Sequence, residues 1–577
     1  SYRPLSQTAI KTHNDMITVY CDSLQGFYDC SPGMTVGELA RKIDTGCRYP
    51  VVAALVDNML KELSYPIYSS HTIKFLDFTS SDGRRTYTRS LSFVLQKAAV
   101  DLCPDLFLFL DYTLPNGLYG ELRRKTGDRT YETVPAGAER VGALRRRMAE
   151  IVAADIPFEK KKMPNDEAAA LFRRNGRPEK ASLVADMEKF FVSVYWLDGY
   201  ADTFYGPLLE RTGAIDVFDL IPYGDGFCLQ APSAADPSVI SPYKYQDKLS
   251  AVFKENSRWC SILGAHGIGS VNESIKRGEA KDLIAVAEAL HERKYAMIAD
   301  RIYEKRDTVK LVLIAGPSSS GKTTTSKRLA MQCRVLGLRP LVIAMDDYFL
   351  DRDRTPRDEH GEYDFESIYA LDLPFLGAQL NDLFDGKEVE LPKYDFVKGS
   401  RVFDGRKMQM HEGDILIMEG IHALNPELTK HVDGKKVFRV FASALTSLSV
   451  DENNYISTAD NRLLRRMVRD NFSRGITPED TILRWKSVRA GEEKNIFPYQ
   501  ENADAMFNSA LLFELPLLRY YAEPLLERIP PLSEAYSESV RLLKFLSYIT
   551  PLTPDEIECI PPTSVMREFI GGSTFEY

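Results

Sequence analysis

The 577-residue sequence lacks the features that mark several classes of protein. Its eight cysteines are scattered, with no C-x-x-C pair and no cysteine–histidine cluster of zinc spacing, which argues against a structural zinc module. No apolar run approaches the roughly 18 residues of a membrane span. The first residues have neither the apolar core nor the cleavage site of a signal peptide. We therefore expect a cytoplasmic protein with reduced thiols and no membrane association.

Net positive charge is also missing. The chain carries 73 Lys and Arg residues against 82 Asp and Glu residues, which gives a formal charge of −9. This balance argues against attraction to nucleic acid through its phosphates. The basic clusters at 123–125 and 145–147 lie among acidic neighbours, which is typical of solvated helix faces. Nucleic acid is therefore not an expected partner of the chain as a whole.

Low-complexity tracts and internal repeats are absent as well. What remains is an ordinary globular composition, with 44% hydrophobic and 27% charged residues. A chain of this length exceeds what one hydrophobic core usually supports, so several domains are expected. The strand and helix patterns predict an α/β, multidomain fold whose parts are a β-grasp domain (1–79), an α+β domain (80–232), a helical connection (233–308), a P-loop domain (309–528) and a helical extension (529–577).

Local patterns support the first three parts. Alternating residues at 17–23 and 72–80 predict strands, and a capping-box pattern at 35–38 predicts the start of a helix between them. A polar turn is expected at 80–85, where the second domain begins. The connection is predicted to end in a long helix at 281–305, because apolar residues recur there with helical period.

After Lys310 the chain alternates short apolar runs with helical segments. Runs of this kind, continuous rather than alternating, are typical of parallel strands that are covered on both faces. The extension from 529 onward is expected to pack against the body. The predicted strands are "KLVLIAG", "PLVIAMD", "DILIMEG" and "KVFRVFA".

Residues 315–323 read "AGPSSSGKT" and directly follow the first of these strands. Glycines at 316 and 321 allow backbone geometry in which successive N–H groups point inward at a polyphosphate. Lys322 would reach the β- and γ-phosphates, and Thr323 would place its hydroxyl on Mg²⁺. The helix that follows adds its positive N-terminal end. The motif predicts binding of ATP with Mg²⁺ by Gly316, Pro317, Ser318, Ser319, Ser320, Gly321, Lys322, Thr323 and Thr324.

Acidic residues follow the second and third strands, at the edge where ligands bind in open α/β sheets. Asp346 could take a proton from an acceptor hydroxyl or hold magnesium through water, while Asp347 could instead be a turn residue. Glu419 lies at the same edge, where a carboxylate is costly unless it serves a metal. Thr323, Asp346 and Glu419 are therefore the expected metal ligands. His422, in "EGIHAL", is interpreted as a packed residue rather than a base.

An arginine-rich helix is predicted at 461–475, "NRLLRRMVRDNFSRG". Its apolar residues would face the core and leave the arginines largely free. A merely solvated face is one interpretation. In a phosphotransfer protein, a mobile arginine lid that neutralises the transition state is the preferred one. The arginines concerned are Arg462, Arg465, Arg466, Arg469 and Arg474.

Further blocks follow in the order found in the uridine kinase and phosphoribulokinase family: "YDFES" at 363–367, "LPKYDFVKGSR" at 391–401 and "MEGIHAL" at 418–424. With the phosphate loop, they make the region 310–510 resemble that family of P-loop kinases. The resemblance implies an ATP-dependent kinase that uses Mg²⁺ and phosphorylates an alcohol group. The implied acceptor is a nucleoside such as uridine or cytidine, or a related small polyol.

The resemblance also implies roles for individual residues. Asp346 would be the general base and would share the magnesium ion with the two other ligands named above. Glu366 would contact the ribose of the acceptor and Tyr394 its base, with Arg466 near the acceptor. The implied catalytic set comprises Asp346, Lys322, Arg469 and Arg474, the two arginines acting on the nucleotide phosphates.

Two positions depart from the uridine kinase pattern. Gly399 stands where those enzymes have a histidine that reads the pyrimidine, and Ile476 stands where they tend to have a second arginine after the lid motif. The phosphate-handling part is complete, but the base-reading part is not. The alternative is a sugar-phosphate kinase of the phosphoribulokinase type, which would prefer anionic acceptors and place Arg401 or Arg484 near them.

The N-terminal half resembles other proteins. Residues 17–78 are similar to the TGS module, and 80–230 to the second additional domain of threonyl-tRNA synthetase. Arg89 and Phe93, in "RSLSF", stand where that domain has an H-x-x-x-H pair, so metal or editing chemistry is not expected. Partner binding or regulation remains. The whole arrangement resembles the long bacterial uridine kinases with a TGS module. A second alternative function is a nucleotide-regulated tRNA or translation-associated binding protein. The chain could also form a homo-oligomer.

Overall fold

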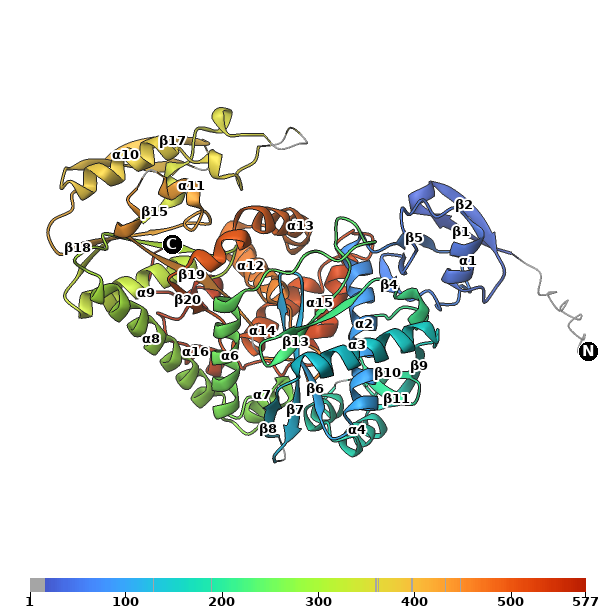
Figure 1. Cartoon of the computed structure of the whole chain (residues 1–577). Coiled ribbons are helices and arrows are strands. Elements are labelled where there is room, and N and C mark those ends of the chain that lie inside the picture. The colour runs from blue at the N-terminus through green and yellow to red at the C-terminus, as the bar shows by residue number, and fades with distance from the viewer. Residues whose placement is uncertain are drawn as a thin grey trace, which may run out of the picture.

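The computed structural model describes residues 16–576 except 128, 188, 358–360, 362, 396, 397, 431 and 447. Figure 1 shows the kinase-like sheet and the N-terminal β-grasp module at opposite ends of the molecule. Within the described part of the chain, no helix has the length and apolar character needed to cross a membrane.

The first module is a β-grasp fold, as the sequence predicts. Its five-stranded sheet has the order β2-β1-β5-β3-β4, with β1 and β5 parallel. Thr35 and Glu38 form the expected capping box at the start of α1. The elements are β1 (Ile17–Cys21), β2 (Gly26–Cys30), α1 (Val36–Lys42), β3 (Ala53–Val56), β4 (Met59–Lys61) and β5 (Thr72–Leu76).

An α+β region follows, in which two sheets and the helix α2 share a core around Phe93. One prediction is wrong here, because residues 81–85 form the first turns of α2 rather than a separate turn. Ser80 caps this helix by accepting the N–H of Gly83. The elements are α2 (Ser81–Leu102), β6 (Phe107–Leu114), β7 (Gly117–Lys125), β8 (Tyr131–Val134), α3 (Gly137–Ala153), β9 (Glu159–Pro164), α4 (Asn165–Arg174), α5 (Pro178–Ala185), β10 (Phe191–Leu197), β11 (Tyr200–Thr203), β12 (Asp219–Tyr223) and β13 (Gly226–Gln230).

The connection contains three helices, α6 (Asp247–Ile262), α7 (Ile268–Lys276) and α8 (Ala280–Glu304). The last confirms the helix predicted at 281–305. It runs alongside α9 and covers one face of the kinase-like sheet, where its buried residues meet those of β14 and β19. The connection is therefore part of the packing of the kinase region.

The kinase-like region is a five-stranded parallel sheet of order β15-β18-β14-β19-β20. The four predicted strands are confirmed, while β20 escaped prediction because it has only four residues, "AMFN". Helices α8 and α9 cover one face and α10 the other, so β14 is buried along its whole length. The elements are β14 (Leu311–Ala315), α9 (Lys322–Val335), β15 (Arg339–Ala344), α10 (Leu373–Phe384), β16 (Val389–Asp395), β17 (Ser400–Met408), β18 (Asp414–Glu419), α11 (Pro426–Thr429), β19 (Val437–Ser443), α12 (Thr458–Arg474), α13 (Pro478–Asn495) and β20 (Ala505–Asn508).

The C-terminal part packs against the body, as expected. Its buried residues join those of α7, α8 and α12 in one large hydrophobic cluster. Its helices are α14 (Glu514–Leu526), α15 (Tyr536–Leu546), α16 (Pro554–Glu558) and α17 (Arg567–Ile570). Short 3-10 helices complete the structure: η1 (Asp22–Leu24), η2 (Thr212–Ala214), η3 (Met345–Tyr348), η4 (Arg352–Arg354), η5 (Ile368–Ala370), η6 (Gly434–Lys436) and η7 (Phe497–Asn502).

The two halves of the chain meet at residues 451–455, which lie between β19 and α12. Asn453 donates to the carbonyl of Leu108 at 2.9 Å, and Asn454 donates to the carbonyl of Thr203 at 3.3 Å. The segment that leads into the arginine-rich helix is thus held by the N-terminal half. The domain limits given above stay a prediction.

Candidate active site

The phosphate loop joins the central strand β14 to α9, as its motif requires. Gly321 has φ +79°, and Ser319 also adopts the left-handed region with φ +59°. A Cβ on Gly316 would lie 2.0 Å from the carbonyl oxygen of Ala442, so only glycine fits there. The backbone therefore has the conformation in which loop N–H groups can face an anion.

The predicted metal ligands meet at the carboxyl edge of the sheet. Thr323 donates its hydroxyl to Oε1 of Glu419, the last residue of β18, at 2.9 Å. Burial raises the pKa of Glu419 to about 7, against the nearby charge of Lys322, and Asp346 raises it further. Burial makes the charged form of Glu419 unfavourable, and a cation bound beside it would offset this desolvation cost.

Asp346 lies in η3, directly after β15, with part of its surface open to solvent. The protein around it still desolvates the carboxylate and raises its pKa, while Lys322 lowers it. The described residues contain no group of three or more His, Cys, Asp or Glu side chains that could hold a metal. Two carboxylates and a hydroxyl fit Mg²⁺, because this ion keeps several waters and takes few protein ligands.

Lys322, the first residue of α9, is the cation common to these groups. Its Nζ donates to the carbonyl oxygen of Pro317 at 3.3 Å. Its charge lowers the pKa of three carboxyls that belong to three separate segments: Asp346, Glu366 and Glu419. Lys322 therefore lies near three expected site residues: the base Asp346, the metal ligand Glu419 and the acceptor contact Glu366.

The arginine-rich helix departs from its prediction. Arg462 and Arg465 are fully buried, not free, because two distant carboxylates pair with them. Arg462 binds Glu492 of α13 and the carbonyl of Ser318, at 2.8 and 3.0 Å. Arg465 pairs in the same way with Glu514, at 2.8 Å. Both arginines brace the phosphate loop from behind.

Glu492 completes this brace, because its Oε1 accepts the N–H of Ser318 at 2.9 Å. Sequence reasoning missed both glutamates, since neither belongs to a recognised motif and each lies about 30 or more residues from its arginine. No local signal could have found them.

The other three arginines of α12 gather around the buried Asp470. Arg466, Arg469 and Arg474 contact its carboxylate at 3.3, 2.9 and 3.4 Å. Arg466 also donates to the hydroxyl of Ser318 at 2.7 Å, which places it at the phosphate loop. Asp470 was not predicted, although its spacing of four residues from two of the arginines is a signal for such pairs.

The residues expected to contact the acceptor, Glu366 and Tyr394, are both largely enclosed by the protein. Burial raises the pKa of Glu366 to about 7, Glu492 raises it further, and Arg466 lowers it. Tyr394, on β16, is buried and packs against Phe349 with ring centroids 5.7 Å apart. Its N–H is accepted by Asp347 at 3.1 Å, which gives Asp347 a structural role.

The side-chain space at Gly399 is taken by Arg352. Gly399 has φ +67°, and a Cβ there would lie 2.7 Å from Nε of Arg352. Gly399 is the position at which the pyrimidine-reading histidine of the resembling kinases is missing. The guanidinium of Arg352 occupies the space that a side chain at this position would need. Arg401 donates to Asp372 at 2.9 Å, and its place near an anionic acceptor stays a prediction. Arg484 is exposed on α13, and residues 396 and 397 of the "YDFV" block lie outside the described part.

Two further histidine-related interpretations concern buried positions. His422 is almost fully buried, and burial lowers its pKa to about 4, which agrees with a packed, neutral residue.

In the N-terminal half, Phe93 is fully buried against Phe158 and Phe204, with ring centroids 5.9 and 5.2 Å apart. Arg89 donates to the carbonyl of Pro207. This region is a packed core and not an open site.

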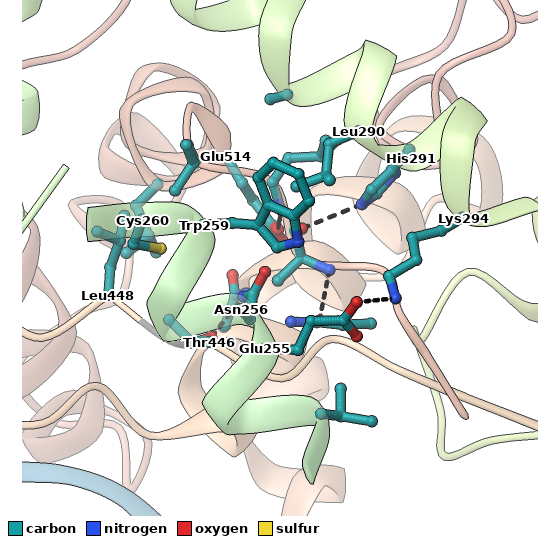
Figure 2. A pocket seen from close by; sticks show the side chains of 18 of the residues that line it. Glu255, Asn256, Trp259, Cys260, Leu290, His291, Lys294, Thr446, Leu448 and Glu514 are labelled. Atoms are coloured by element: carbon teal, nitrogen blue, oxygen red, sulfur yellow. Dashed lines mark hydrogen bonds and ion pairs between the residues drawn. The ribbon is translucent and has the colours of Figure 1, made fainter. Parts of the chain in front are cut away.

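A small cavity of about 50 Å³ lies beside the site, between α6, α8 and the loops after β19 and β20. Figure 2 shows Trp259 among the side chains that line it, with the ion pair of Lys294 and Glu255 on one side. Nε2 of His291 donates to the carbonyl oxygen of Ala510 at 3.1 Å. Sequence reasoning did not find this cavity, because its walls come from two segments, 252–294 and 446–515, that are far apart in the sequence.

The C-terminal segment also reaches the phosphate loop. Oε2 of Glu568, in α17, accepts the hydroxyl of Thr324 at 2.7 Å and its N–H at 3.3 Å. Thr324 is the third residue of α9, so this N–H is one that the helix itself leaves unpaired. A carboxylate thus sits at a position expected for nucleotide phosphate.

Comparisons with known proteins agree with both resemblances. The family described as "Phosphoribulokinase / Uridine kinase family" matches residues 311–512. Uridine kinase of Staphylococcus epidermidis is 31% identical over 195 residues, covering 34% of this chain and 84% of that protein. D-glycerate 3-kinase from Cryptococcus neoformans matches with 16% identity over 36% of this chain and 88% of that chain, at a TM-score of 0.25, which is too low to support a fold assignment.

The N-terminal region is similar to a different protein. Threonine–tRNA ligase of Acetivibrio thermocellus is 28% identical over 190 residues, covering 33% of this chain. The chain spans only 29% of the length of that ligase.

Proposed function

The chain belongs to the phosphoribulokinase / uridine kinase family of ATP-dependent kinases, and we propose that it transfers the γ-phosphate of ATP to a hydroxyl of a nucleoside such as uridine or cytidine, or of a related small polyol. The observation that carries this proposal is the position of Lys322. One lysine at the phosphate loop acts electrostatically on three carboxyls suited to the base, the metal and the acceptor.

In this proposal the chain's own residues bind and orient both substrates. The N–H groups of residues 318–324 and the side chain of Lys322 hold the triphosphate, and Arg469 and Arg474 neutralise charge that develops on the transferred group. Mg²⁺, held by Thr323, Glu419 and Asp346, would neutralise phosphate charge when bound.

Asp346 supplies the acid–base chemistry. It takes the proton of the acceptor hydroxyl as the new oxygen–phosphorus bond forms and ADP leaves. Glu366 orients the acceptor by accepting a hydrogen bond from it, with Arg466 and Tyr394 beside it. The raised pKa of Asp346 suits a base, because a more basic carboxylate accepts a proton more readily.

The test is ADP release measured with nucleosides, free sugars, polyols and sugar phosphates as acceptors, with ATP binding measured in parallel. We expect release with at least one nucleoside or polyol. Intact ATP binding with no active acceptor would contradict the proposal. It would favour a nucleotide-regulated, translation-associated binding protein, to which the similarity of the N-terminal half to threonine–tRNA ligase points.

A second candidate, phosphorylation of an anionic acceptor, is favoured by Arg352. Its guanidinium fills the space at Gly399, and its charge acts on the phenol of Tyr394. Replacement of Arg352 by Ala should then raise KM for sugar phosphates about tenfold, the worth of a charged hydrogen bond. Arg354→Ala, an exposed arginine on the same 3-10 helix, is the matched control.

A further inference from the structure

The C-terminal segment around α17 lies against the phosphate loop and the start of α9. In Figure 1 the C-terminus lies beside the kinase-like sheet, although Glu568 of α17 is 244 residues from Thr324 of α9 in sequence. Oε2 of Glu568 takes both donors of Thr324, the hydroxyl at 2.7 Å and the N–H at 3.3 Å. Each of these donors has one hydrogen, so a phosphate oxygen at this place would need the same hydrogens.

Charged groups of both signs lie around Glu568. Burial lowers the pKa of Arg474, and the negative charges of Asp470 and Glu568 oppose this. The charge of Glu568 also adds to the raised pKa of Glu419, which has burial as its main cause. The carboxylate therefore lies within electrostatic reach of both the arginine-rich helix and the expected metal ligand.

The segment that carries Glu568 is firmly anchored. A Cβ on Gly321 would lie 2.3 Å from Cγ2 of Val565, so this side chain presses on the loop. The guanidinium of Arg465 lies 5.0 Å from the ring centroid of Phe569. Val565 and Phe569 both belong to the large hydrophobic cluster. The backbone of this segment is thus held in place. The side chain of Glu568 is only partly buried, so it can change its rotamer without movement of the backbone.

We propose that Glu568 is an autoinhibitory residue, whose carboxylate occupies the place of a nucleotide phosphate at Thr324 and must swing away before ATP binds. This inference rests on the proposed function, because it takes the loop to be the ATP site. If a bound group must first move away, only the molecules in which it has moved can bind the ligand. The apparent affinity for the ligand is therefore lowered when most molecules have the group in place. The segment around Glu568 then sets how readily the kinase accepts nucleotide.

The test is calorimetric titration of the full chain with a non-hydrolysable ATP analogue and Mg²⁺. Glu568→Ala should tighten binding about tenfold relative to the wild type, the effect of removing a charge-assisted hydrogen bond. Glu568→Gln, which keeps the size of the side chain, should give a smaller gain and remains informative if the alanine variant does not fold. Glu558→Ala, which removes an exposed carboxylate of α16 in the same region, should leave the affinity unchanged.

Unchanged or weaker binding by the Glu568 variants, with measurable binding by the wild type, would overturn the autoinhibitory role alone. No binding by the wild type or by any variant would overturn the proposed function and the inference with it. An equal gain in Glu558→Ala would show a general effect of charge and would also overturn the specific role of Glu568.

Discussion

The carboxyl edge of the kinase-like sheet and the closed interior of the N-terminal half place a lysine and an aspartate in opposite circumstances. At the sheet edge, Lys322 donates to a backbone carbonyl and Asp346 keeps an exposed surface. In the N-terminal half, Lys180 is fully buried and paired with Asp202. Charged residues can thus bind a ligand where they face a space that the ligand can enter. Where they pair with one another in the interior, they contribute only to the folded structure.

The largest effect expected from this difference concerns Lys322. Replacement by Ala removes the cation that would meet the transferred phosphate and should lower kcat/KM for ATP about 10³-fold, as loss of a transition-state donor does. Steady-state ADP release measures this. Lys327→Ala, in the same helix, is the control. An equal loss in both variants would show that the effect comes from the helix and not from the position of Lys322.

The second prediction concerns the closed region. Phe93→Ala empties part of a packed core and should lower the free energy of unfolding by about 3 kcal/mol. Denaturant unfolding measures it. Per folded molecule, kinase activity should stay unchanged, because Phe93 faces no ligand. A fall in activity of the folded variant would mean that the N-terminal half takes part in the reaction.

The smallest effect is a pH dependence at the open site. Glu366 has its pKa raised to about 7 by burial, so it changes from neutral to charged between pH 6 and 8. The charged form accepts stronger hydrogen bonds from the hydroxyl groups of an acceptor than the neutral form does. KM for the acceptor should therefore fall as pH rises through this range, by up to about tenfold.

The glutamine variant tests the origin of this dependence. Glu366→Gln cannot titrate and should have a flatter KM profile than the wild type. Identical profiles would assign the dependence to another group, such as Glu419, which has a similarly raised pKa.

Much of the fold could be predicted because its signals are local. Continuous apolar runs identified four strands of the parallel sheet, and the glycine spacing identified the loop between β14 and α9. The capping box at Thr35 fixed the start of α1. Strand β20 could not be found, since four residues carry no periodicity.

The site was predictable only in part, for a physical reason. Burial of an arginine depends on a carboxylate that tertiary packing brings to it, so Arg462 and Arg465 could not be separated from their neighbours without Glu492 and Glu514. Glu568 shows the same limit, because it approaches the loop from the other end of the chain. The motifs located the polar edge but not the groups that brace and cover it.

Two matched substitutions test the central claim most directly. Asp346→Asn and Asp202→Asn each remove one carboxylate charge, one at the sheet edge and one in the closed core. ADP release with the best acceptor, normalised to the folded fraction, should fall about 10³-fold for Asp346→Asn, as expected for loss of a general base. It should stay within about twofold of the wild type for Asp202→Asn, because Asp202 is fully buried against Lys180 and faces no ligand. Full turnover by Asp346→Asn, or a comparable loss in Asp202→Asn, would contradict the account.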